Sequence, residues 1–156
     1  MFCKTPLAAK LSGVAALTFA LLAAHSFGWS HNSVSQDRDA AVAKFVAERL
    51  QTWQKRMNLK EWDIHVELVR ADKLEPKTLG NIHWDTDLKV ATIGVLAPED
   101  YTLPYKPMLD DMEFTIVHEL VHLELASLPR SEASRRVEEH AVNEIADALL
   151  NLARHQ

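Results

Sequence analysis

Cysteine and basic charge are both scarce in this sequence of 156 residues. The only cysteine is Cys3, close to the amino terminus, so no disulfide is expected within the folded domain. Acidic residues number 22 against 17 lysines and arginines, and this balance argues against nucleic acid as a partner. Internal repeats and low-complexity tracts are also missing.

The longest apolar run, Leu11 to Ala24, follows Lys4 and Lys10 and is shorter than the roughly 20 residues that span a bilayer. It predicts a signal peptide over residues 1–26 with cleavage after Ser26, and an uncleaved membrane anchor is the alternative. Cleavage would leave a secreted or periplasmic protein without stable membrane insertion. That protein would hold 15 basic against 22 acidic residues, a formal charge of −7.

Residues 27–36 are rich in serine, asparagine and histidine and predict a short linker, whereas residues 37–156 suffice for one compact domain. An apolar stripe predicts a first helix from about Asp37 to Met57. Alternation of apolar and polar residues predicts a strand over 62–69, and two further strands, 79–84 and 90–96, flank the turn 85–87 as a hairpin would. The predicted fold is α+β.

The stretch His118-Glu119-Leu120-Val121-His122 is the most informative part of the sequence. On a helix, residues four apart share a face, so His118 and His122 can present two imidazole nitrogens to one Zn²⁺. Glu119 lies roughly 100° further round, where it can reach a metal-bound water as a general base. This pattern indicates metal-assisted hydrolysis.

The surrounding residues favour a helix at this motif. Asp110 or Asp111 can cap its start, and apolar residues follow at spacings of three and four. The stripe predicted for the buried face consists of Phe114, Val117, Val121 and Leu125.

A third metal ligand must come from another segment. The extended metzincin pattern requires glycine and histidine three and six residues after the second histidine, where this chain has Leu125 and Leu128. A long amphipathic helix over 135–150, opened by Ser131 or Ser134, offers Glu138 and Glu139 instead. Helical geometry alone does not choose between these two glutamates, because both fall on or beside the apolar face.

At these residues the chain resembles minimal gluzincin metallopeptidases, and it is similar to ImmA/IrrE-type and SprT-like domains over about its last two-thirds. ImmA/IrrE-type proteins follow H-E-x-x-H with a helix patterned E-x-x-A-N-x-F-A, whose glutamate is the third zinc ligand. Residues 139–146 match at Glu139, Asn143 and Ala146, with Val142 and Ile145 as departures. The resemblance implies a zincin-like fold and favours Glu139 as the ligand, with Glu138 as the alternative.

The expected function is that of an exported zinc metallopeptidase acting on a peptide or protein, with oligomeric state left open. Two alternatives remain: a zincin-like metal-binding or interaction module without catalysis, and a zinc amidase acting on a non-protein substrate. Retention of Glu119 favours catalysis, because a structural site needs ligands but no base.

Zincins commonly bind the substrate backbone along the strand nearest the active helix, and residues 91–96 resemble that strand. Gly94 would then permit close backbone approach. Tyr101 or Tyr105, in the proline-rich loop 97–109, could donate a phenolic hydrogen bond at the cleft.

Overall fold

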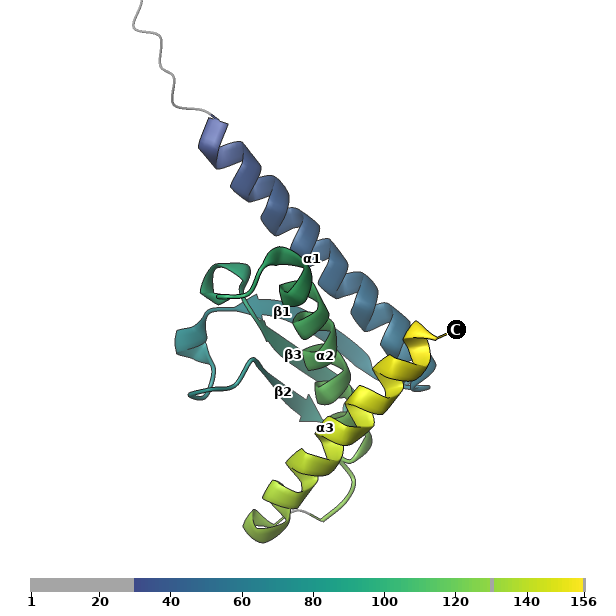
Figure 1. The fold of residues 1–156 in the computed structure, drawn as a ribbon. Helices are drawn as coiled ribbons and strands as arrows, with labels where there is room; N and C mark the ends of the chain where they lie inside the picture. Colours follow the sequence, from purple (N-terminus) through teal and green to yellow (C-terminus); the bar gives the residue numbers. More distant parts are fainter. Residues whose placement is uncertain (1–29, 130, 156) are drawn as a thin grey trace, which may run out of the picture.

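The computed structural model describes residues 30–129 and 131–155. Its elements run in the order helix, three strands, helix, helix, as predicted, and make an α+β fold (Figure 1). They are α1 (Ser30–Arg56), β1 (Asp63–Val69), η1 (Ala71–Lys73), β2 (Gly80–Asp85), β3 (Val90–Leu96), η2 (Pro98–Asp100), α2 (Tyr105–Glu124) and α3 (Glu132–Arg154), where η denotes a short 3-10 helix.

The predicted signal peptide, residues 1–26, lies outside the described residues. Helix α1 begins at Ser30, so residues 30–36 of the predicted linker are helical, and the first turns of this helix project away from the other elements (Figure 1). None of the described helices is long and apolar enough to cross a bilayer.

The three strands form one mixed sheet in the order β1-β3-β2. β2 and β3 are antiparallel, which confirms the predicted hairpin, and β1 pairs in parallel with β3. β3 is therefore the central strand, and β2 is an edge strand.

The helices cover one face of the sheet, and the other face is polar. On β1, Ile64 is buried among apolar residues, whereas Asp63, His65 and Glu67 are exposed. Helix α2 contacts α1, α3, β2 and β3, so it runs through the middle of the structure. The core joins residues from four of these elements: Val46 and Trp53 of α1, Ile93 and Val95 of β3, Met112, Ile116 and Leu120 of α2, and Ala146 and Leu150 of α3.

Helix α2 starts earlier than the sequence predicts. Pro104 is its N-cap, and Asp110 and Asp111 lie inside the helix, so the prediction that one of them caps the start is wrong. Pro107 falls in the first turn, where a missing backbone N–H costs no helical hydrogen bond. The prolines that indicated a loop therefore allow the helix to begin there.

Helix α3 begins at Glu132, directly after Ser131. From residue 135 onward its buried residues are Val142, Ala146 and Leu150, at spacings of four, whereas Ile145 is 43% exposed. This rotation of the helix decides which side chains of its first half face α2.

Candidate metal centre

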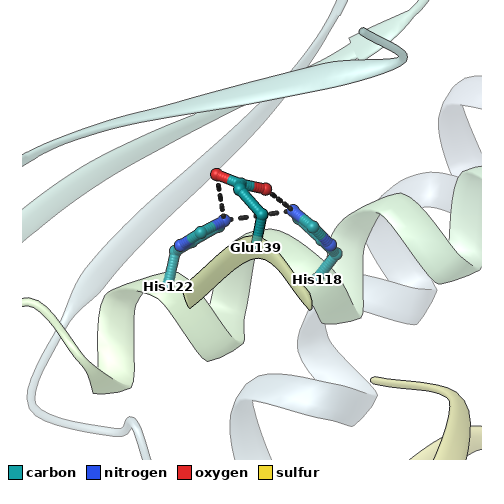
Figure 2. A group of neighbouring side chains, drawn as sticks. All are labelled: His118, His122 and Glu139. Atoms are coloured by element: carbon teal, nitrogen blue, oxygen red, sulfur yellow. Dashed lines mark hydrogen bonds and ion pairs between the residues drawn. The ribbon is translucent and has the colours of Figure 1, made fainter. Parts of the chain in front are cut away.

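Two helices bring together the three residues that the sequence and the family resemblance single out as metal ligands. His118 and His122 lie on α2, and Glu139 lies on α3. The two Nε2 atoms are 3.1 Å apart, and the Glu139 carboxylate lies 3.5 Å from each of them. Figure 2 shows the three side chains pointing toward one another. One ligand atom from each residue falls within 4.8 Å of the others, close enough to hold a metal ion.

The other ring nitrogen of each histidine is held by an oxygen atom from α3. The Nδ1 atom of His118 lies 3.0 Å from Oδ1 of Asn143, and Nδ1 of His122 lies 3.1 Å from Oε1 of Glu138. An amide or carboxylate oxygen accepts hydrogen bonds, so each Nδ1 carries the hydrogen and donates it. Both Nε2 lone pairs then face the centre of the group, as in protein zinc sites.

This donor set fits Zn²⁺. Two neutral imidazoles and one carboxylate direct electron pairs toward one another, and a cation between them would satisfy all three groups. Burial and the nearby His122 lower the pKa of His118, so protonation of this ring is a poor substitute for a metal. Three protein ligands leave a position for water or substrate, as catalytic rather than structural zinc sites do.

Glu119 lies buried beside this group. Thr115, Glu119 and His122 are the buried polar residues in the described part of the chain, and all three lie on α2 facing the same cleft. Burial, and then the negative charge of Glu139, raise the pKa of Glu119 to about 8. A divalent cation in the group would counter the charge of Glu139 and favour the ionised, basic form of Glu119.

Gly80 makes room for the Glu119 carboxylate. A Cβ atom at residue 80 would overlap the Thr115 side chain, would lie 2.8 Å from the carbonyl oxygen of Gly94, and would lie 3.3 Å from Oε1 of Glu119. The sequence predicts instead that Gly94 permits the close approach of a substrate backbone. A Cβ atom there would meet Asn81 and Val69, and Gly94 does not line the cleft, so that prediction is wrong.

Strand β2 and helices α2 and α3 border a cleft of about 890 Å³ that contains the group. The prediction that residues 91–96 bind substrate as an added strand is wrong, because β3 already pairs with a strand on each side. The strand on the cleft is β2. Leu79 accepts a hydrogen bond from Leu96, so antiparallel alternation directs the backbone groups of Gly80 and Ile82 toward the open edge.

The predicted phenolic donors lie elsewhere. The hydroxyl of Tyr101 donates to Asp111 at 2.9 Å, and Arg38 lies over the ring of Tyr105. Neither tyrosine lines the cleft.

Three other histidines of the described residues lie outside the metal group. His65 pairs with Asp63 on the polar sheet face, and His140 is exposed on α3. His83 lines the cleft from β2, but it does not belong to the group that could hold a metal.

The contact of Asn143 with His118 was not predicted from the sequence, although this asparagine is one of the residues that match the family pattern. An amide one turn after a predicted ligand glutamate is the signal that could have indicated it.

Comparison with known proteins adds no assignment, since no family model, no curated protein and no solved structure matches this chain.

Proposed function

We propose that this chain is a zinc-dependent metallopeptidase, with His118, His122 and Glu139 as the zinc ligands and Glu119 as the general base. The observation that carries the proposal is the convergence of three acceptor atoms beside a buried carboxylate that is not one of them. A metal held only for stability would need the three ligands, but it would not need a second carboxylate buried beside them.

Each residue has a separate part in the proposed reaction. Zinc, when bound, supplies Lewis acidity, which acidifies water and polarises a carbonyl group. Glu119 takes the proton of the attacking water and returns it to the leaving amine. Asn143 and Glu138 keep the two imidazoles oriented with Nε2 inward.

A peptide substrate is favoured by the edge of β2. The backbone groups that Gly80 and Ile82 direct outward can pair with an extended chain, which would then run through the cleft past Glu119 and His118. A non-protein amide offers no such ladder of hydrogen bonds. Export, which the apolar run from Leu11 to Ala24 predicts, would place this enzyme outside the cytoplasm.

Metal content and peptidase activity of the full chain test the proposal together. Purified wild-type protein should carry about one zinc ion by mass spectrometry and cleave unfolded protein substrates. Glu119→Gln should keep the zinc and lose activity by about 10²- to 10⁴-fold, because only the proton transfer is removed. Glu139→Gln should lose both the zinc and the activity, because it removes a proposed ligand.

His140→Gln is the matched control, since His140 is exposed and adjacent to Glu139 on the same helix. It should keep both zinc and activity. Wild-type protein that binds no zinc, or a Glu119→Gln variant that still cleaves at the wild-type rate, would contradict the proposal.

A further inference from the structure

One part of the cleft is basic, although the protein as a whole is acidic. Lys73, Lys77 and Arg135 all line it. Lys73 ends η1, Lys77 lies in the loop before β2, and Arg135 lies in the first turn of α3. We call these three residues the basic patch.

Arg135 stands next to the metal centre. It precedes Glu139 by four residues, so the two side chains share a face of α3 about 6 Å apart along the helix axis. Because Arg135 and the metal group line the same cleft, one extended peptide can reach both.

Arg135 of the basic patch already forms an ion pair with a carboxylate of the protein. The Nη2 atom of Arg135 lies 3.7 Å from Oε2 of Glu75, which joins α3 to the loop before β2. Both side chains are more than two-thirds exposed, and such pairs exchange readily for another partner. Lys73 and Lys77 form no ion pair with any residue that the structure describes, so Glu75 is the one carboxylate paired with the basic patch there.

We propose that the basic patch binds a carboxylate of the peptide substrate, beside the bond to be cleaved. This inference rests on the proposed function and names a class of substrate for it. The carboxylate can be an aspartate or glutamate side chain, or the free carboxyl terminus of the peptide. The planar guanidinium of Arg135 suits either source, because it can donate two parallel hydrogen bonds.

The acidic residues of the cleft do not oppose this binding once metal is present. Glu119, Glu138 and Glu139 surround the metal centre, where a divalent cation balances part of their charge. The basic patch then gives its part of the cleft a positive potential toward an arriving peptide. The preference for a carboxylate should weaken as ionic strength rises, since the patch is exposed.

Selection from a randomised octapeptide library tests the inference. Zinc-loaded full-chain Glu119→Gln, which should bind without cleaving, is immobilised, and the bound peptides are sequenced by mass spectrometry. We expect roughly tenfold enrichment of aspartate and glutamate, or of free over amidated carboxyl termini, as for a charge-assisted pair. The first result identifies a side chain as the source, and the second identifies the terminus.

Adding Arg135→Gln or Lys77→Gln to the Glu119→Gln protein should reduce the enrichment factor toward one, which means no preference for a carboxylate. Arg154→Gln is the matched control, because it removes the same charge from the same helix about 28 Å further along. It should retain the enrichment. Equal capture of acidic and neutral peptides, capture of no peptide, or enrichment that survives both patch variants would overturn the inference.

Cleavage by the chain with Glu119 intact is measured separately on the same library. Cleavage without carboxylate preference would reject the basic patch and leave the peptidase standing. Carboxylate-selective binding without cleavage would reject the peptidase and leave the patch as a binding site.

Discussion

Glu138 and Glu139 are neighbours in sequence but meet different atoms of the metal centre. The Glu139 carboxylate lies 3.5 Å from Nε2 of both histidines, whereas Glu138 lies 3.1 Å from Nδ1 of His122. Glu139 shares its face of α3 with the buried Val142 and Ala146. Glu139 therefore lies where the proposed ligand would be, and Glu138 holds the histidine ring that it adjoins.

Asn143→Ala should weaken zinc binding by about 10- to 100-fold. The asparagine oxygen fixes the His118 ring with Nδ1 protonated, and without it the ring is free to rotate or change tautomer. Competition with a chelator of known affinity measures the effect. Asn151→Ala makes the same change at an exposed position of α3 and should leave the zinc affinity as it is; an equal loss there would point to a general weakening of the helix.

At the residue scale, the sequence predicted the H-E-x-x-H group because its spacing is local and depends only on a helix. The choice of Glu139 came from resemblance, since helical periodicity left both glutamates on the apolar face. The spacing from Glu139 could have drawn attention to Asn143, but not to its contact with His118, because that contact depends on the angle and rotation of α3 against α2. Those are properties of the packed molecule.

Gly80 of strand β2 lies close against Thr115 and Glu119 of helix α2. Gly80→Ala should lower the free energy of unfolding by about 1–3 kcal/mol, because the added methyl group meets the Thr115 side chain and the backbone oxygen of Gly94. Denaturant unfolding of the two proteins measures this difference.

Gly94→Ala is the informative comparison within the same sheet. Its methyl group would meet the Asn81 side chain, which can rotate away more easily than a backbone carbonyl can shift. We expect a smaller loss of stability at residue 94. A larger loss at residue 94 than at residue 80 would contradict this expectation. It would mean that helix α2 moves away from a methyl group at residue 80 more easily than the Asn81 side chain moves away from one at residue 94.

Element boundaries were harder to predict than element types. The hairpin of β2 and β3 follows from two apolar runs around a polar turn, and the structure confirms it. Which strand lies at the edge depends on the parallel pairing of β1 with β3, a contact between distant segments. For this reason the sequence placed the substrate strand on β3 rather than on β2.

The proposed metal joins two helices of the core, so zinc should stabilise the whole domain. With free zinc at 100 times its dissociation constant, the gain is about 2.7 kcal/mol, which corresponds to a rise in melting temperature of roughly 10 °C. Thermal unfolding with added zinc and with a chelator measures this shift. His118→Ala should abolish it, and a shift that persists in that variant would place the metal elsewhere.

At the scale of the whole molecule, composition and periodicity were enough to predict a small α+β domain with a helix, three strands and two further helices in that order. They did not reveal the basic patch, because Lys73, Lys77 and Arg135 are scattered over more than sixty residues of sequence. Only the folding of α3 against the loop before β2 brings them to one cleft.

The order of the two ligand helices matters while the chain is being made. Helix α2 leaves the ribosome before α3, which supplies Glu139 together with Glu138 and Asn143. A nascent chain that ends at residue 129 carries the H-E-x-x-H helix without a third ligand, and nothing from α3 orients its imidazoles. The proposed zinc site is therefore incomplete until α3 has been made and has packed against α2.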